Sequence, residues 1–351
     1  MKPTRFLTSM KPTRFLTLFG AIVFGSIFQP AQAQDNELTL YTQRHYAFDE
    51  TVHAKFFETT GIKINVVKAA ADELIVRLKE EGENTPADIF MTTDGGTLHR
   101  AHEAGLLRPM TSETALEKVH PPLREKDSHW VAMTRRARVI VHSKDRVEPS
   151  ELSTYKELAD ERWRGRVVVR SSTNSYNQAL LTTVIEADGR EKALEWAAGV
   201  RKNMARPPQG SDRDQVRAVA AGLADVAIVN TYYIGILETA EEQKDRDAAA
   251  AVKIFFPNQD GRGTHVNISG LGVVKASKKV VLANQFIDFL LSEEVQAQYS
   301  ENTFEYPVVD GVPLSERQQR WGEFKADDVD FSVLGDLNAE ALKVFNEAGW
   351  E

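Results

Sequence analysis

The chain is organised around residues 224–233, which read Ala-Asp-Val-Ala-Ile-Val-Asn-Thr-Tyr-Tyr. The run at 224–229 is typical of a buried strand, and two tyrosines follow it directly. Adjacent side chains point to opposite faces of a strand and diverge by about 100° on a helix, so Tyr232 and Tyr233 converge only if the backbone turns there. Because open α/β sheets bind ligands at the carboxyl ends of their strands, the pair indicates either a ligand site or two core aromatics at a strand-to-helix junction.

Strands and helices alternate along the first third of the chain. The pattern predicts strands at 37–42, 62–67 and 88–91 and helices at 49–60, 72–81 and 97–104. This alternation favours a parallel sheet with helices on both faces. The long strand predicted at 130–143 carries arginines in mid-chain, which suits a crossover between two lobes. Further strands are predicted at 165–170, 224–229, 252–257 and 271–274, and an apolar helix at 283–291.

We therefore predict an α/β protein of two lobes, with a ligand cleft between lobes joined by two crossover strands. The crossovers are expected near 136–142 and 257–267. The predicted boundaries are lobe 1 at 34–137 and 263–312, lobe 2 at 138–262, and C-terminal helices packed on lobe 2 at 313–351.

Residues 1–33 are predicted to form a secretory signal peptide. An apolar run at 15–28 follows a basic segment and precedes the A-x-A cleavage signal that ends at Ala33. The basic segment contains no acidic residue and carries Lys2, Arg5, Lys11 and Arg14. Cleavage near Ala33 removes these four charges and takes the net charge from −8 to −12. We therefore expect a periplasmic protein with no stable membrane insertion and no nucleic-acid partner.

The candidate ligating groups are phenols. The chain has no cysteine, which excludes thiolate metal sites and cysteine nucleophiles. Tyr46 and Tyr176 also follow predicted strands, and His45 precedes Tyr46. A phenol with a pKa near 10 binds most ions poorly, but a strongly acidic cation displaces its proton, as ferric iron does. Phenolates and an imidazole suit a hard trivalent ion better than Cu(I), Ca²⁺ or Mg²⁺. The excess phenolate charge calls for nearby arginines, for which the candidates are Arg44, Arg136 and Arg138.

Five stretches of the chain resemble the periplasmic ferric-iron-binding proteins of ABC importers, most closely the Fut-type branch. They are YTQRHY at 41–46, RARV at 136–139, NSY at 174–176, NTYYIG at 230–235 and GRGTHVNISG at 261–270. The resemblance implies the type II periplasmic binding fold, Fe(III) as the bound ion, and delivery to an inner-membrane ABC permease with its ATPase. We expect a monomer.

Carried onto this sequence, the resemblance implies Tyr46, Tyr176, Tyr232 and Tyr233 as iron ligands, with Arg136 beside them. His45 is a ligand in some members of the family and a bystander in others, so both readings stay open. Arg44 is the second arginine that we expect near the ion.

Two other functions compete with iron binding. The first alternative is a protein of the same fold that holds an organic or anionic molecule, with the tyrosines stacking on it and Arg44 and Arg136 pairing with an anion. An enzyme is disfavoured because neither G-x-S-x-G nor H-E-x-x-H occurs. Six further histidines are expected to be surface or packing residues: His53, His99, His102, His120, His129 and His142. His99 and His102 share a predicted helix face, but nothing nearby in the sequence completes a metal set.

Overall fold

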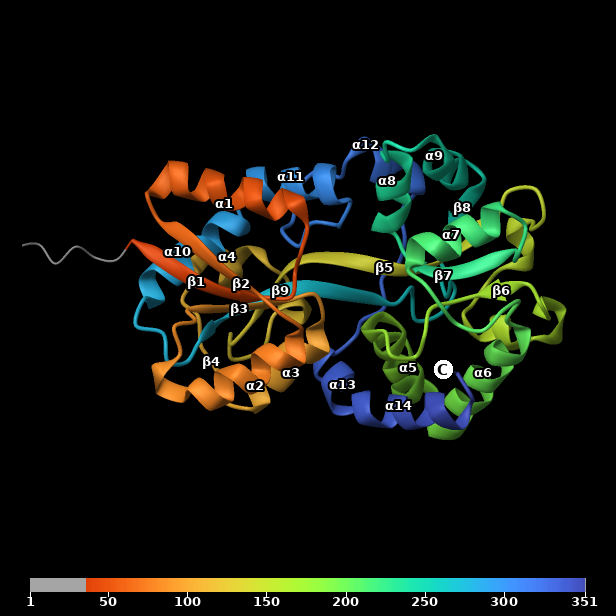
Figure 1. The fold of residues 1–351 in the computed structure, drawn as a ribbon, viewed down its shortest axis with the longest axis horizontal. Helices are drawn as coiled ribbons and strands as arrows, with labels where there is room; N and C mark the ends of the chain where they lie inside the picture. The colour runs from red at the N-terminus through yellow and green to blue at the C-terminus, as the bar shows by residue number, and fades with distance from the viewer. Residues whose placement is uncertain (1–35, 351) are drawn as a thin grey trace, which may run out of the picture. The chain divides into compact units, whose positions relative to one another are not determined.

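The structure, a computed structural model, describes residues 36–350 (Figure 1), so the predicted signal peptide lies outside the described residues. Its strands run in the order β2-β1-β3-β9-β5-β7-β6, with β4 paired to β9 and β8 paired to β5. β1 (Glu37–Thr42) is parallel to β2 (Lys63–Lys68) and β3 (Ile89–Thr92), but β9 (Val266–Val274) is antiparallel to β3. The sheet is therefore mixed, not parallel as predicted, because β9 returns from the other lobe.

The long strand β5 (Val131–Ser143) joins two lobes. Its first half pairs with β9 as far as Ala137, and its second half pairs with β7 (Val226–Asn230) from Arg138 onward. In Figure 1, β5 and β9 lie side by side along the middle of the described chain. The predicted crossover at 136–142 thus coincides with the point where β5 changes partner. The strand predicted at 271–274 is the second half of β9, which begins five residues earlier.

The first lobe surrounds the β1–β3 and β9 end of the sheet. Its core packs apolar faces such as Phe56 and Phe286, whose ring centroids lie 4.9 Å apart, against the strands. Its other elements are α1 (Ala47–Thr60), α2 (Ala71–Glu81), η1 (Gly82–Asn84), α3 (Gly95–Glu103), β4 (Leu107–Arg108), α4 (Glu113–Lys118), η2 (Pro121–Leu123), α10 (Val280–Leu290) and α11 (Glu293–Thr303).

The second lobe has one apolar core on each face of its strands. In β7, Val226 and Ile228 belong to one core and Ala227 and Val229 to the other, as the alternation of side chains along a strand requires. Its other elements are η3 (Pro149–Glu151), η4 (Lys156–Ala159), η5 (Glu161–Trp163), β6 (Val167–Val168), α5 (Ser175–Asp188), α6 (Arg190–Asn203), α7 (Asp212–Ala220), α8 (Tyr232–Glu238), α9 (Gln243–Ala250) and β8 (Val252–Phe255).

The C-terminal segment contacts both lobes, whereas the sequence placed it on lobe 2 alone. α12 (Glu316–Trp321) and α14 (Asn338–Glu347) contact lobe 2, as the Arg317–Glu238 ion pair and the burial of Phe345 in its core show. α13 (Phe331–Asp336) packs on α3 of lobe 1, where a Cβ on Gly96 would lie 2.7 Å from the backbone of Leu334, and it also contacts α5 of lobe 2. Only a glycine permits this close approach. Among residues 36–350, no helix is both long and apolar enough to span a membrane.

Candidate metal centre

Phenols from both lobes meet at the sheet junction. The hydroxyl of Tyr232 donates a hydrogen bond to the hydroxyl of Tyr176 across 3.2 Å. The ring of Tyr46, from lobe 1, meets the ring of Tyr232 edge-on with 6.0 Å between centroids. The ring centroid of Tyr233 lies 4.3 Å from that of Tyr232. The structure therefore brings together all four tyrosines that the sequence singled out, from segments up to 187 positions apart in the numbering.

Helix starts position these side chains. Tyr46 is the N-cap of α1, and Tyr176 is the second residue of α5, whose N-cap Asn174 accepts a hydrogen bond from the Tyr176 amide at 3.1 Å. Tyr232 and Tyr233 open α8, so the backbone does turn directly after β7. Helical side chains lean toward the N-terminus, which aims these rings back at the sheet edge. The positive ends of the 14-residue helices α1 and α5 also favour negative charge on nearby phenols.

Burial keeps three of these phenols protonated while no ion is bound. It raises the pKa of Tyr46, Tyr232 and Tyr233 above the ordinary value, and the negative charge of a phenolate at Tyr176 would add to this effect. For Tyr46 the carboxylate of Glu305 raises the pKa further, while the Arg44 guanidinium opposes it. For Tyr232 the opposing cation is Arg136. Only a strongly acidic ion would displace protons from such groups at neutral pH.

His45 lies at the rim of this cluster. Its side chain is exposed, and its ring is nearly parallel to that of Tyr46, with 5.9 Å between centroids. Its Nδ1 lies 3.3 Å from the carbonyl oxygen of Gln43. The imidazole is therefore beside the phenols without being enclosed by them.

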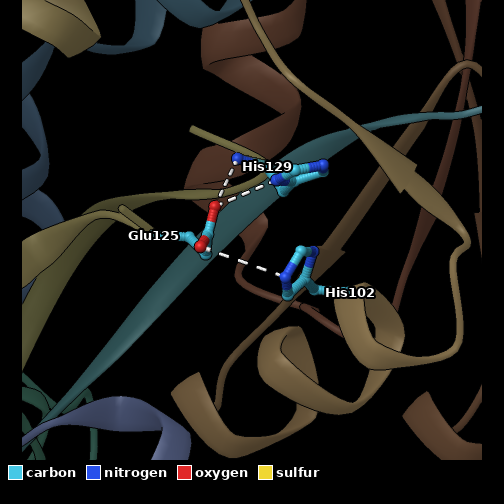
Figure 2. Close-up of side chains that lie close together, drawn as sticks. All are labelled: His102, Glu125 and His129. Atoms are coloured by element: carbon cyan, nitrogen blue, oxygen red, sulfur yellow. Dashed lines mark hydrogen bonds and ion pairs between the residues drawn. The ribbon is translucent and has the colours of Figure 1, made fainter. Parts of the chain in front are cut away.

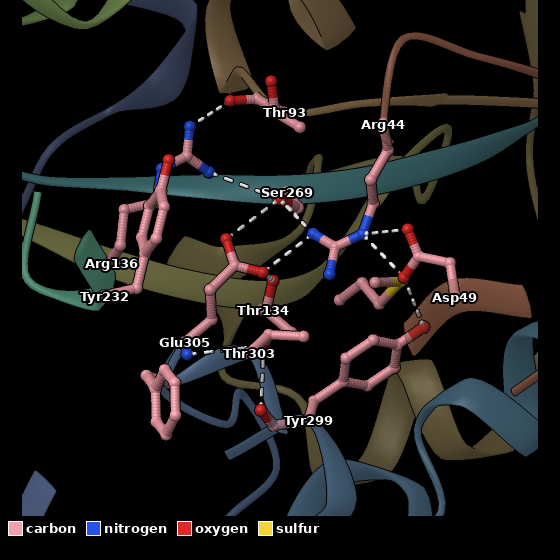
Figure 3. Close-up of polar contacts among 12 residues, drawn as sticks. Arg44, Asp49, Thr93, Thr134, Arg136, Tyr232, Ser269, Tyr299, Thr303 and Glu305 are labelled. Carbon is pink, nitrogen blue, oxygen red and sulfur yellow. Dashed lines mark hydrogen bonds and ion pairs between the residues drawn. The ribbon is translucent and has the colours of Figure 1, made fainter. Parts of the chain in front are cut away.

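Arg44 is buried and surrounded by acidic groups (Figure 3). Its guanidinium binds Asp49 at 3.0 Å and Glu305 at 2.8 Å, and lies 4.3 Å from the ring centroid of Tyr46. Two carboxylates outnumber this one cation, so the group as a whole has no positive charge left to offset phenolates. The expectation that Arg44 lies beside the tyrosines is met geometrically, but its charge is already balanced by Asp49 and Glu305.

Arg136 differs because it forms no salt bridge with any of the described residues. Its guanidinium donates to the carbonyl oxygen of Thr93 and, at 3.4 Å, to the hydroxyl of Ser269. It lies 5.7 Å from the ring centroid of Tyr176. A buried cation with only neutral partners is the group best able to stabilise phenolates here.

Two further arginines approach the same ring. Arg138 lies 5.7 Å and Arg170 5.5 Å from the Tyr176 centroid, and both pair with the buried carboxylate of Asp212, at 2.7 and 3.6 Å. Arg138 was expected here from the sequence, whereas Arg170 and Asp212 were not. The sequence contained a signal for Arg170, because this residue ends the predicted strand at 165–170 that leads to Tyr176. It contained no signal for Asp212, because that residue lies in a loop-to-helix segment far from Tyr176 in the sequence.

The chain matches the family model described as bacterial extracellular solute-binding protein over residues 84–332. It is 48% identical to iron uptake protein A1 of Synechocystis, over 91% of this chain and 88% of that protein. Among solved structures, a Trichodesmium FutA protein in complex with iron and citrate is 46% identical, with a TM-score of 0.85 over 90% of this chain and 100% of that one.

A ferric binding protein from Campylobacter jejuni is 42% identical, also with a TM-score of 0.85, over 90% of this chain and 100% of that chain. These similarities extend over both lobes and show that the chain has the two-lobed fold of periplasmic binding proteins. The chain belongs to the bacterial extracellular solute-binding protein family.

Proposed function

We propose that this protein captures ferric iron in the periplasm and delivers it to an inner-membrane ABC permease with its ATPase. The observation that carries the proposal is the meeting of Tyr46 from lobe 1 with the hydrogen-bonded pair Tyr176 and Tyr232 from lobe 2. Tyr46, Tyr176, Tyr232 and Tyr233 bind Fe³⁺ as phenolates, with His45 as a fifth ligand at the rim. The protein acts as a monomer, is not an enzyme, and matures by cleavage near Ala33.

Capture proceeds by closure of the lobes. Tyr176 and the tyrosine pair belong to lobe 2, so they form a three-phenol platform before the lobes meet. Iron loads on this platform, and Tyr46 completes the site when the lobes rotate about β5 and the segment before β9. Tyr46→Phe should leave the first association step intact and accelerate iron release. Equal effects of Tyr46→Phe and Tyr232→Phe on association would contradict this order.

The decisive experiment adds ferric citrate to the purified chain of residues 34–351. A visible charge-transfer band should appear at one iron per protein and vanish in Tyr232→Phe/Tyr233→Phe. A colourless wild-type protein would overturn the proposal. Citrate without iron is the matched control, because tight ligands raise the melting temperature. A shift with citrate alone that equals the shift with ferric citrate would favour the alternative, a protein of this fold that binds organic anions.

A further inference from the structure

Two histidines and a glutamate of lobe 1 come together away from the tyrosines (Figure 2). His102 lies at the end of α3, and Glu125 and His129 lie on the segment between η2 and β5. One potential ligand atom from each of the three lies within 4.8 Å of those from the other two. The two imidazole rings are 4.2 Å apart at their centroids. The sequence offered no nearby partner for His102, whereas the structure brings two residues to it from 23 and 27 positions later in the chain.

A purely structural role does not account for His102. Neighbouring histidines have ordinary partners, as His99 contacts Asp336 at 3.1 Å and His120 contacts Asp310 at 2.9 Å. The imidazole of His102 forms no hydrogen bond with any described residue: its Nδ1 is buried without a partner, and its Nε2 lies 3.8 Å from Glu103 Oε1 and 3.9 Å from Glu125 Oε1. A mostly buried imidazole that faces a carboxylate at this distance leaves room for an ion between them.

Hydrogen bonds hold the Glu125 side chain in one orientation, as is typical of a metal ligand. Its Oε2 accepts hydrogen bonds from the backbone amides of Asp127 at 2.8 Å and His129 at 3.2 Å, and from His129 Nδ1 at 3.0 Å. Its side chain is 8% exposed, whereas those of His102 and His129 are each 20% exposed. His102 and Glu125 line a cavity of about 440 Å³ between α3 and the residues leading into α13. The cluster is thus both ordered and reachable from solvent.

We propose that His102, Glu125 and His129 form a second metal site, for a divalent first-row transition ion such as Zn²⁺. Two imidazoles and one carboxylate are a common ligand set of zinc sites, and water supplies the fourth ligand. Ligand atoms that share a tetrahedral ion at about 2.1 Å lie about 3.4 Å apart. One ligand atom from each of the three side chains already lies within 4.8 Å of the other two, so side-chain movements draw them onto the ion. Imidazoles suit divalent transition ions better than hard Fe³⁺, so the two sites differ in specificity.

Binding of the ion changes the tautomer of His129. In the metal-free cluster Nδ1 of His129 donates a hydrogen bond to Glu125 Oε2. For Nδ1 to become a ligand, its proton passes through water to Nε2, so the imidazole stays neutral and no proton is released overall. Glu125 keeps its backbone hydrogen bonds, so it need not turn. The ion then ties α3 to the segment before β5 within lobe 1, and the proposal does not depend on iron binding.

The test is to titrate zinc into the tag-free chain of residues 34–351 after a chelator has removed bound metal. Calorimetry measures the binding, and the melting temperature is measured with and without zinc. We expect one zinc per protein with Kd below about 10 μM, and a raised melting temperature. His102→Gln and His129→Gln should each weaken binding by about 100-fold or more, since even partners behind the ligands typically matter by 10–100-fold. His99→Gln and His120→Gln are the matched controls and should retain zinc binding. Co²⁺ should give the visible absorption of a tetrahedral site in the wild type and not in His102→Gln.

The proposal would be overturned by no zinc bound at 100 μM, by equal affinity in His102→Gln/His129→Gln and wild type, or by equal losses in the control variants. Glu125→Gln is avoided because that side chain also holds two backbone amides. Either histidine variant tests the proposal by itself. A result from one of them is enough, provided that its circular dichroism spectrum matches that of the wild type. Tyr232→Phe/Tyr233→Phe should lose the ferric band and keep zinc. Loss of zinc in that variant would place the zinc among the tyrosines and refute the second site.

Discussion

Tyr232 and Tyr176 share one hydrogen bond, 3.2 Å between their hydroxyl oxygens, although 56 positions separate them. The bond joins the first turn of α8 to the first turn of α5. Each phenol is thus held in place by the other before any ion arrives, and an ion that binds both must displace the shared proton. Rigid placement of ligands lowers the entropic cost of binding.

Removing one hydroxyl of this pair should lower the affinity for iron far more than removing the hydroxyl of a buried tyrosine outside the cluster. We expect Tyr232→Phe to weaken binding by at least about 100-fold, because partners behind metal ligands already contribute 10–100-fold. Iron transfer to a competing chelator measures this change. Tyr306→Phe is the matched control, since the Tyr306 hydroxyl is buried without a partner and lies outside the cluster. Comparable losses in the two variants would contradict a ligand role for Tyr232.

Iron binding should release protons. The pKa values of Tyr46, Tyr232 and Tyr233 are raised by burial, so these phenols are protonated at neutral pH and must lose their protons to become ligands. Affinity should therefore fall as pH falls, on the order of 10³-fold per pH unit for three released protons. A pH-stat titration with ferric nitrilotriacetate, corrected for the chelator, counts these protons directly. Release of fewer than one proton per iron would exclude phenolate ligation.

Arg136 should control the pH at which iron binds. It forms no salt bridge among the described residues, and its charge lowers the pKa of Tyr232 against the larger effect of burial. Arg136→Gln removes this cation, so iron binding should weaken by about 10–100-fold and shift to higher pH. Arg136→Lys keeps the charge but not the planar fork and should recover part of the affinity. Equal behaviour of the two variants would argue against an electrostatic role.

Glu305 should affect stability and iron binding in opposite directions. It binds the buried Arg44 at 2.8 Å and the Thr134 hydroxyl at 2.9 Å, while its charge raises the pKa of Tyr46 (Figure 3). Glu305→Gln removes one partner of a buried ion pair and should lower the free energy of unfolding by about 2–4 kcal/mol, since Asp49 still binds Arg44.

The same change lowers the pKa of Tyr46, because a negative charge beside its phenol disappears. Iron should therefore stay bound to a lower pH in Glu305→Gln than in the wild type. Denaturant unfolding of the metal-free protein and acid-induced loss of the iron band measure the two effects separately. A variant that loses stability and also releases iron at a higher pH would contradict this account.

Local signals predicted the parts of the site that each segment specifies by itself. The N-cap Asn174 places Tyr176 in the first turn of α5, and a strand that ends at Asn230 places the tyrosine pair at a helix start. Both were visible in the sequence because capping and periodicity act over a few residues. The length of β5 likewise indicated a crossover.

Long-range pairing escaped prediction for the same reason. Arg44 and Glu305 are 261 positions apart, and His102 lies 23 positions from Glu125, so no local pattern links them. The antiparallel course of β9 depends on where the chain re-enters lobe 1, and the docking of α13 depends on two glycines of α3. Both are set by tertiary packing, which propensity does not encode.

Gly235 lets α8 of lobe 2 lie close against Phe304 of lobe 1. It lies one turn after Tyr232 in α8, and a Cβ placed on it would lie 2.4 Å from Cγ of Phe304. Phe304 ends α11 of lobe 1 with φ 59°, so its ring is fixed by a backbone that has little freedom to move.

Gly235→Ala should therefore hold the lobes apart and draw Tyr46 away from Tyr232. Overpacking of this kind costs about 1–3 kcal/mol, which corresponds to roughly 5- to 150-fold faster iron release. Stopped-flow release to a chelator measures the rate. Gly261→Ala is the matched control, since its Cβ would meet only Asn258 at 3.7 Å. An unchanged rate in Gly235→Ala would mean that the iron-loaded lobes do not meet at this glycine.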